Sequence, residues 1–450
     1  MQSDEWLRNY LESGNIKWLS DYFDLTVLID EKIDGFTRYA HNHSSFANIE
    51  NFNIALYRKT GVNISAHMKL ADELLWINRH KSTSYKYRLK RKYLLTSELY
   101  NVCLSLQYQY LNKETTTSLV SKFDRLCKPA LDLEDSILQT EPKFILLPSA
   151  NYEAVTNEIL RSTRLRECSS TILAIDNWDN LCSKTVIAWM PDYITCMGPQ
   201  QAAFCRDIHD INMNRVYSIG TPRFDIYRSE IMNSINKCSA TYNVGGQSVK
   251  ILYLGSSQPN NEVTILQTID CFLHQDINRI NKYQVVYKPH PSRRFTYNDI
   301  ASIKSLETIE ILPESMDGML NQSDLDLFTT LEANCKLFVD ADIFICGPTT
   351  MLLEALLCKK TVLLMVDQSQ SISSNQILFN QLMHFRGISN HPGVKLIYNL
   401  DQLCDQILSA DLRKDSLEVF QSHKHIIDYY VTLDRRQWAE RLFDDVLKLT

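Results

Sequence analysis

The sequence predicts an α/β fold with two domains, each built around a doubly wound parallel sheet. Short apolar segments alternate with longer segments in which apolar residues recur every three to four positions, as strands and their covering helices do. The 450 residues also exceed what one hydrophobic core usually holds. A polar stretch at 236–248 separates two regions that each carry this alternation. Such alternation is typical of parallel sheets covered by helices on both faces.

The predicted elements follow in order along both halves. A helix over residues 5–21 leads into the first strand, and helical spacing returns over 62–80 and 97–112. The strands of the first half are predicted at 25–29, 144–147, 171–175, 193–196 and 215–219. Those of the second half are predicted at 250–254, 283–287, 308–312, 342–346 and 361–365.

This order of elements divides the chain into domains. We predict an N-terminal Rossmann-like domain at residues 1–228, a linker at 229–248 and a C-terminal Rossmann-like domain at 249–430. Residues 431–450 are expected to form a helix that packs back on the first domain. Ligands of open α/β sheets bind at the carboxyl ends of the strands, so a cleft between the two sheets is the expected active site.

Composition excludes several classes of function. A net charge of −6 does not suit a nucleic-acid-binding protein, whose affinity rests on many cationic contacts with phosphates. The twelve cysteines contain no Cys-x-x-Cys pair, which indicates reduced residues of a cytosolic protein. No apolar run approaches the ~18 residues that span a bilayer, and the N-terminus has no signal core. We therefore expect a cytoplasmic location with, at most, peripheral membrane contact.

The first polar loop of the second half follows the strand at 250–254. It contains Gly255, Ser256 and Ser257, small residues whose backbone N–H groups can approach an anion closely. The loop is therefore a candidate phosphate site, and a plain turn is the alternative interpretation.

The second loop, Lys288-Pro289-His290-Pro291, follows the strand at 283–287. Its two prolines fix the backbone on either side of the histidine, so the imidazole is held at the sheet edge. A rigid backbone position of this kind suits a side chain that must contact a phosphate or a leaving oxygen in fixed geometry. Lys288 adds a positive charge. The alternative is a turn whose histidine merely packs.

The third loop joins the strand at 342–346 to a helix. Gly347, Thr349 and Thr350 precede the apolar helix that begins at Met351, so free N–H groups and the positive end of a helix dipole would face the ligand. Glu354, one turn into this helix, could accept hydrogen bonds from ribose hydroxyls. The alternatives are N-capping by the threonines and a favourable dipole contact for Glu354.

In the first half, a dense polar block follows the strand at 171–175. Asp176 or Asp179 could take a proton from an acceptor hydroxyl or stabilise a developing cation, and Asn177, Ser183 and Lys184 would lie on the acceptor side. The alternative is an Asx-rich turn. A further loop, Gly220 to Asp225, is expected to turn the chain toward the linker.

Two patterns bear on metals and membranes. The spacings Asp324-x-Asp326 and Asp340-x-Asp342 occur in metal-dependent transferases, but a helix-like stretch and a buried strand are their predicted settings, so no metal or other cofactor is expected. Residues 79–93 interleave cations with tyrosines. This stretch is either a solvated helix face or a patch for anionic lipid headgroups or a lipid-linked acceptor at the inner membrane.

Several of these blocks resemble those of bacterial surface-polysaccharide glycosyltransferases. Lys288-Pro289-His290-Pro291 resembles the His-Pro motif of bacterial sialyltransferases, Kdo transferases and CDP-glycerol glycerophosphotransferases. Residues 341–366 resemble their donor-site strand–helix–strand unit. Residues 176–184 are similar to an Asp-Asn block of surface-carbohydrate enzymes, and 220–225 to a Gly-x-Pro-x-x-Asp pattern. The resemblance implies the GT-B fold, in which two Rossmann-like domains face a central cleft.

The resemblance departs at the start of the chain. Only seven residues precede Arg8, too few for the usual first Rossmann strand. Either the first sheet lacks that strand or the chain start is shortened, which puts any glycine-loop role of residues 8–14 in doubt.

The resemblance implies transfer of a sugar from a nucleotide-activated donor, with a lean to a CMP-linked one, to a bacterial surface glycan such as O-antigen, capsule or lipopolysaccharide. The family's histidine contacts the donor phosphate, which makes His290 the matching candidate. One alternative is a CDP-polyol phosphotransferase of teichoic-acid-like polymer synthesis. The other is a non-catalytic binding partner in polysaccharide assembly.

Overall fold

The computed structural model describes two compact units of the chain. One comprises Met1–Asp225, Gln381–His384 and Tyr430–Thr450, and the other comprises Ile226–Asn380 and Phe385–Tyr429. The residues described are 4–30, 52–57, 84, 131–148, 154–184, 187, 189–228, 231, 248–256, 262–290, 293, 295–312, 330–366, 375–409 and 416–449. The predicted helices at 62–80 and 97–112, the stretch 79–93 apart from Ser84, and nearly all of the predicted linker 229–248 lie outside them.

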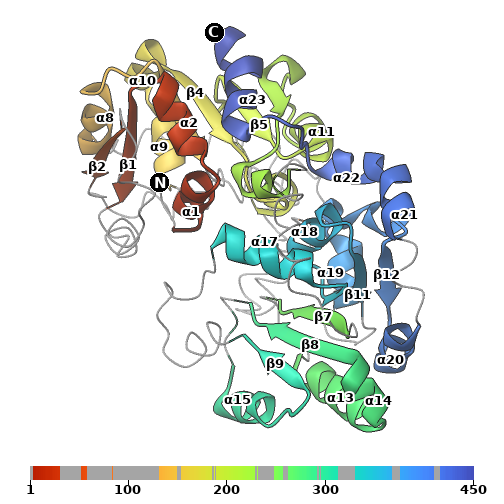
Figure 1. Ribbon diagram of the computed structural model, residues 1–450. Coiled ribbons are helices and arrows are strands. Elements are labelled where there is room, and N and C mark those ends of the chain that lie inside the picture. The colour runs from red at the N-terminus through yellow and green to blue at the C-terminus, as the bar shows by residue number, and fades with distance from the viewer. Residues whose placement is uncertain are drawn as a thin grey trace, which may run out of the picture. The chain divides into compact units, whose positions relative to one another are not determined.

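The first unit opens with two helices, where the sequence predicted one. α1 (Asp4–Glu12) and α2 (Asn15–Tyr22) are separated at Gly14, whose φ of 74° lies in the left-handed region that glycine enters without strain. The predicted strand follows as β1 (Leu25–Asp30) and pairs in parallel with β2 (Phe52–Tyr57), which the sequence analysis missed (Figure 1).

A parallel four-stranded sheet forms the rest of this unit. Its strands are β3 (Phe144–Pro148), β4 (Ser170–Ala174), β5 (Tyr193–Cys196) and β6 (Val216–Ser218), which pair in sequence order. The connecting helices are α8 (Leu131–Leu138), α9 (Ala154–Arg161), α10 (Thr163–Cys168) and α11 (Pro199–Asp207). Each predicted strand of this region is present within one residue of its expected bounds, and the residues of β3, β4 and β5 contribute to the core.

The last helix, α23 (Trp438–Asp445), packs beside α2 in this same unit (Figure 1). Asp225 fixes it there, because its carboxylate accepts the backbone N–H of Trp438 at 2.6 Å and pairs with the Arg441 guanidinium at 2.9 Å. The same carboxylate accepts a hydrogen bond from Asn15 at 2.9 Å. The loop 220–225 therefore anchors both ends of the described chain to this unit.

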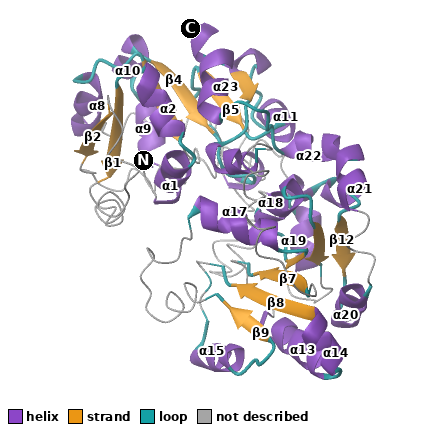
Figure 2. Cartoon of the chain, viewed as in Figure 1, coloured by secondary structure: helices purple, strands orange, loops and turns teal. Residues whose placement is uncertain are grey.

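The second unit contains a parallel six-stranded sheet (Figure 2). In chain order its strands are β7 (Val249–Leu254), β8 (Tyr283–Lys288), β9 (Ile309–Ile311), β10 (Ile343–Cys346), β11 (Thr361–Met365) and β12 (Val394–Ile397). Their order across the sheet is β12-β11-β10-β7-β8-β9, so the direction of winding reverses between β7 and β10. Two units with parallel sheets confirm the predicted α/β class, and β12 is an addition to the prediction.

Helices connect these strands and follow the last of them. They are α13 (Glu262–His274), α14 (Ile277–Lys282), α15 (Tyr297–Lys304), α17 (Leu331–Asp340), α18 (Met351–Leu357), α19 (Asn375–Gln381), α20 (Leu400–Leu408), α21 (Ser416–Ser422) and α22 (Lys424–Tyr430). All residues of β10 and β11 are buried, which accounts for their continuous apolar sequence.

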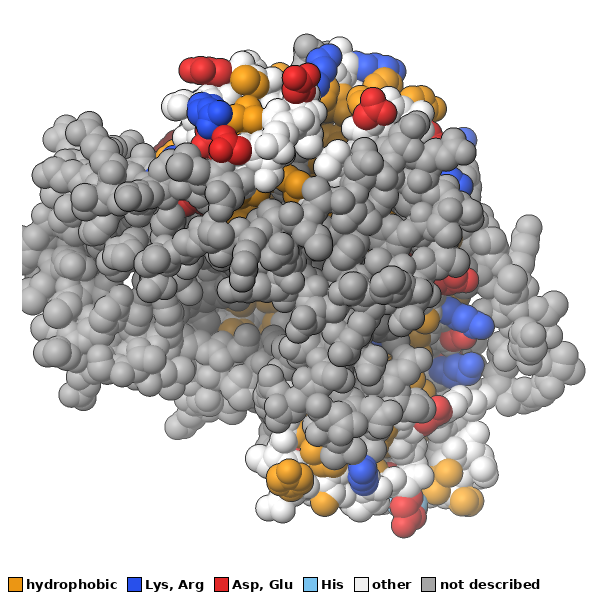
Figure 3. All heavy atoms as spheres, turned by 90° about the vertical axis from the view of Figure 1, so that its left-hand side faces the viewer, with side chains coloured by type: hydrophobic (Ala, Val, Ile, Leu, Met, Phe, Trp, Pro, Cys, Tyr) orange, Lys and Arg blue, Asp and Glu red, His pale blue; other side chains and the backbone are white. Residues whose placement is uncertain are grey.

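Two surface properties of the described residues bear on membrane contact. None of the helices among them is both long and apolar enough to cross a bilayer. On the face seen in Figure 3, their basic and acidic side chains lie interspersed with apolar ones. The basic stretch predicted for membrane contact belongs to the part of the chain outside this description, where only Ser84 is placed, buried against Gln381.

Candidate active site

Three of the predicted site loops leave the second sheet at one edge. β7 lies between β10 and β8, and the register places Cys346 opposite Leu254 and Leu254 opposite Lys288. The loops that begin after these three residues therefore start side by side at the carboxyl ends of neighbouring strands. This is also where the winding reverses, the position at which open α/β sheets bind ligands.

The loops after β7 and β8 are in direct contact. The Gly255 N–H donates to the Lys288 carbonyl oxygen at 2.8 Å. A Cβ atom at position 255 would lie 2.8 Å from the His290 backbone nitrogen and 3.1 Å from the Pro289 Cα. Glycine is thus required here by the close approach of another backbone, and this approach places His290 beside the loop after β7.

Glu262 already occupies part of the loop that was predicted to hold an anion. The Ser256 N–H donates to the Glu262 Oε1 at 2.7 Å, so neither this N–H nor that of Gly255 points to open solvent. The Glu262 Oε2 accepts the Tyr287 hydroxyl at 2.5 Å. Ser257 lies outside the described residues. The contribution of this loop is therefore to bring neighbouring elements together, in addition to any contact of the Ser256 side chain.

The loop after β8 holds its cationic groups at different depths. Lys288 is buried, whereas His290 is half-buried at the sheet edge. The His290 carbonyl oxygen accepts the Arg293 N–H at 2.9 Å. Pro291 lies outside the described residues. The backbone of His290 is consequently fixed on both sides, by the close approach of Gly255 and by the hydrogen bond from Arg293.

The loop after β10 carries two threonines, and the Thr350 side chain does not cap the helix that follows. Gly347 is buried, while Thr349 and Thr350 are half-buried. Thr350 is the N-cap residue of α18, yet its side chain makes no capping hydrogen bond, and the first helical bonds run from the N–H groups of Leu352 and Leu353. The structure thus does not support the capping interpretation for Thr350, and its hydroxyl remains a candidate for a ligand.

Glu354 is held by a residue that the sequence analysis missed. The Tyr227 hydroxyl donates to the Glu354 Oε2 at 2.7 Å, and both side chains are buried. Burial, and then the neighbouring Glu354 carboxylate, raise the pKa of Tyr227, so the hydroxyl keeps its proton and remains a donor. One oxygen of the carboxylate predicted to bind ribose is therefore oriented from the segment that follows β6.

In the first unit, the two candidate aspartates have different surroundings. Asp176 is 2% exposed and accepts the hydroxyl of the buried Tyr10 at 3.0 Å. Burial, and then Asp176, raise the pKa of Tyr10, so this hydroxyl also stays protonated. Asp179 is half-buried, and its Oδ2 lies 3.3 Å from the Ser183 hydroxyl. Asp179 is thus the more accessible of the two.

The polar block around these aspartates is rigidly held. Residues Asn180–Lys184 form a π-helix, a rare geometry that often occurs at functional sites. The carbonyl oxygen of Asn177 accepts the Gln201 side chain at 2.7 Å, and that of Leu181 lies 2.7 Å from His209 Nε2. Nothing is described of the Lys184 side chain. The alternative interpretation was an Asx-rich turn. Such a turn does not require the backbone to be fixed by side chains from other elements.

In the described part of the Asp-x-Asp pairs, Asp342 makes a structural hydrogen bond. The Asp342 Oδ2 accepts the Lys250 N–H at 2.9 Å, at the amino ends of β10 and β7 and so opposite the candidate site. Asp324 and Asp326 lie outside the described residues. Among the residues that are described, no group of three or more His, Cys, Asp or Glu side chains is arranged to hold a metal ion.

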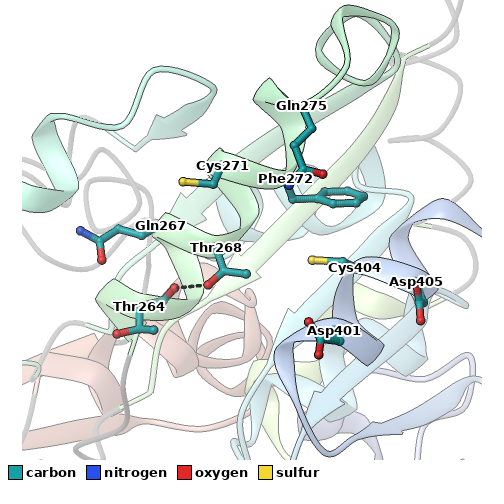
Figure 4. A pocket seen from close by; sticks show the side chains of 9 residues that line it. All are labelled: Thr264, Gln267, Thr268, Cys271, Phe272, Gln275, Asp401, Cys404 and Asp405. Atoms are coloured by element: carbon teal, nitrogen blue, oxygen red, sulfur yellow. Dashed lines mark hydrogen bonds between the residues drawn. The ribbon is translucent and has the colours of Figure 1, made fainter.

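A separate groove of ≈ 460 Å³ lies along α13 and α20 of the second unit (Figure 4). None of the predicted site residues lines it. Its lining residues are Thr264, Gln267, Thr268, Cys271, Phe272, Gln275, Asp401, Cys404 and Asp405.

Comparison with known proteins gives weak similarities. No protein-family model and no curated protein matches the chain. The wall teichoic acid polymerase TagF is 12% identical, over 66% of this chain and 75% of its own, with a TM-score of 0.38. A UDP-GlcNAc 2-epimerase from Methanocaldococcus jannaschii is 11% identical, over 76% and 84%, with a TM-score of 0.42. A glycosyltransferase from Rickettsia africae ESF-5 is 13% identical, over 100% and 98%, with a TM-score of 0.44. Similarity of this degree leaves the assignment of an activity to the residues themselves.

Proposed function

We propose that the chain is a glycosyltransferase of the GT-B type that moves a sugar from a nucleotide-activated donor to a bacterial surface glycan. The observation that carries the proposal is that the loops bearing Gly255, His290 and Thr349 begin at the carboxyl ends of three neighbouring strands. Lys288 supplies a positive charge there, His290 supplies an imidazole, and Thr349 and Thr350 supply hydroxyl groups. This set of groups suits the phosphate of a departing nucleotide, and the reaction would then require no metal.

Glu354 is proposed as the ribose-binding residue of this site. Tyr227 orients one of its oxygens. A carboxylate fixed in this way can accept a ribose hydroxyl with little additional ordering. The polarity of the Tyr227–Glu354 pair suits the nucleoside part of the donor, while the loops after β8 and β10 suit its phosphate.

On the acceptor side we favour Asp179 over Asp176 as the general base. A base must come within hydrogen-bond reach of the proton that it removes. Asp176 is almost fully buried against Tyr10, whereas Asp179 is partly exposed beside Ser183. Asn177, Ser183 and Lys184 are proposed to contact the acceptor, and residues 79–93 to meet the membrane that carries it.

Replacement of His290 tests the donor side of the proposal. The variant His290→Ala should fold normally and lose roughly a hundredfold or more in donor turnover, because it removes a charge-stabilising or proton-donating group. His274→Ala is the matched control, since His274 belongs to α13 of the same unit and is 40% exposed. Equal turnover in the two variants would contradict the proposal.

A thermal-shift screen with CMP, CDP, UDP, GDP and dTDP identifies the nucleotide. A nucleotide present at about a hundred times its dissociation constant should add roughly 2.7 kcal/mol to the free energy of unfolding. Product analysis then separates the two catalytic candidates, because a glycosyltransferase forms a glycosidic bond whereas a CDP-polyol phosphotransferase forms a phosphodiester. Tight nucleotide binding without any turnover would indicate the non-catalytic binding partner.

A further inference from the structure

Glu262 is a buried carboxylate beside the loops that follow β7 and β8. No role has yet been assigned to it. It is the first residue of α13 and is 0% exposed. A buried carboxylate costs several kcal/mol unless charged or hydrogen-bonding partners compensate it. Its position beside a proposed phosphate site increases that cost further, because two negative groups repel. Such a residue needs a structural or functional reason to be there.

The partners of Glu262 come from the loop after β7, from β8 and from the segment after β8. Its Oε1 accepts the Ser256 N–H at 2.7 Å, and its Oε2 accepts the Tyr287 hydroxyl at 2.5 Å. The Arg293 Nη1 lies 4.0 Å from Oε1, with the arginine side chain 14% exposed. Burial, and then Glu262, raise the pKa of Tyr287, so this hydroxyl remains a donor.

Arg293 connects this carboxylate to the candidate phosphate site. Its backbone N–H donates to the His290 carbonyl oxygen at 2.9 Å, so the two residues move together. A guanidinium group binds phosphate in a fixed, often bidentate geometry, provided that the group is already oriented. At 4.0 Å between Arg293 Nη1 and Glu262 Oε1 the contact is a loose ion pair, which can orient the guanidinium group.

We propose that Glu262 is a positioning residue of the donor site: its carboxylate joins the loop after β7 to the segment after β8 and holds Arg293 for the donor phosphate. This inference rests on the proposed function. It adds Arg293 to the groups that contact the phosphate, and it makes Glu262 act through Arg293 and the two loops instead of touching the donor itself.

The direction in which one substitution changes nucleotide affinity distinguishes a positioning role from simple electrostatic repulsion. Glu262→Gln keeps the size of the side chain and an oxygen for the Ser256 N–H, but removes the negative charge. If Glu262 only repelled the phosphate, this change would tighten nucleotide binding. If it positions the site, binding should weaken at least about tenfold, the scale of a lost hydrogen bond to a charged group.

The experiment titrates the wild type and Glu262→Gln with CMP, CDP, UDP, GDP and dTDP, each beside its parent nucleoside. We expect the variant to lose affinity for the nucleotide and to keep its affinity for the nucleoside, which a general loss of structure would not do. Tyr287→Phe, which removes one bond and leaves the charge, should weaken nucleotide binding less. Asp342→Asn is the matched control at the opposite edge of the sheet and should leave both affinities unchanged.

A double-mutant cycle tests the route through Arg293. If Glu262 acts by holding Arg293, the loss in Glu262→Gln/Arg293→Gln should be no larger than in Arg293→Gln alone. Additive losses would overturn this part of the inference. Equal nucleotide affinity in the wild type and Glu262→Gln would overturn the inference and leave the proposed function standing. If no nucleotide binds the wild type more tightly than its nucleoside, the proposed function fails and the inference fails with it.

Discussion

The buried pair of Asp225 and Arg441 should be essential for the stability of the first unit. Both side chains are 1% exposed, and their atoms Oδ1 and Nη2 lie 2.9 Å apart. Asp225→Asn preserves the shape of the side chain and removes its charge, which leaves the arginine buried without its main counter-ion. The other oxygen of Asp225 also accepts the Trp438 N–H and the Asn15 amide, so the change weakens contacts to α23 and α2 as well.

The size of the effect follows from this burial. Breaking a buried ion pair by removing one partner costs about 3–5 kcal/mol, whereas an exposed pair contributes about 1 kcal/mol or less. Asp434 supplies the matched comparison, because its carboxylate lies 3.4 Å from the same arginine but its side chain is 41% exposed. We therefore expect Asp225→Asn to lower the free energy of unfolding of this unit by about 3 kcal/mol, and Asp434→Asn by about 1 kcal/mol at most.

Tryptophan fluorescence during urea unfolding measures this unit selectively. The six tryptophans of the chain, at positions 6, 18, 76, 178, 189 and 438, all belong to it. A separate probe, far-ultraviolet circular dichroism, follows both units and shows whether they unfold together. If Asp225→Asn and Asp434→Asn shift the fluorescence midpoint by the same amount, burial does not determine the strength of this pair and the reasoning is wrong.

Three further changes test other contacts. Gly255→Ala should weaken binding of the nucleotide found in the thermal-shift screen at least about tenfold, because the new Cβ would push the His290 backbone away; an unchanged dissociation constant would count against the shared edge. Tyr227→Phe should cost about 1.5–3 kcal/mol in urea unfolding, since it leaves the buried Glu354 oxygen without its 2.7 Å donor, and a loss below 0.5 kcal/mol would be inconsistent with that bond. Burial, and then two neighbouring histidines, lower the pKa of His391 to about 4, below the ~6.5 of an unfolded chain. The unfolded state therefore binds more protons between these values, and the stability present above pH 6.5 should fall by about 2–3 kcal/mol on approach to pH 4; His391→Gln should flatten this dependence in denaturation curves at pH 7 and pH 4.5.

Most strands could be predicted because their residues are largely apolar, and apolar segments of this length are typical of buried strands. β10 is apolar throughout and β11 is apolar after Thr361, as expected of strands whose residues are all buried. β12 was missed because it is a four-residue edge strand with Lys395 exposed in its middle. The break at Gly14 was missed because glycine also occurs inside helices, and only its backbone angle shows the change of direction.

The loops of the candidate site could be predicted from the sequence, but the residues that contact the candidate side chains could not. Polar residues that directly follow apolar strands are visible in the sequence, which is why His290 and Thr349 were singled out as candidates. The partners that orient such residues come from distant segments: Tyr10 lies 166 positions before Asp176, and Tyr227 lies 127 before Glu354. Glu262 offered one signal, an acidic residue at the start of an apolar helix after a strand-end loop, which is equally typical of a helix start.

A crystal structure with the nucleotide from the screen tests the central claim most directly. The account predicts phosphate density at the carboxyl ends of β7, β8 and β10, within hydrogen-bond distance of His290 and of a hydroxyl of Thr349 or Thr350. Density for the nucleotide in the groove along α13 and α20, with none at this edge, would contradict it.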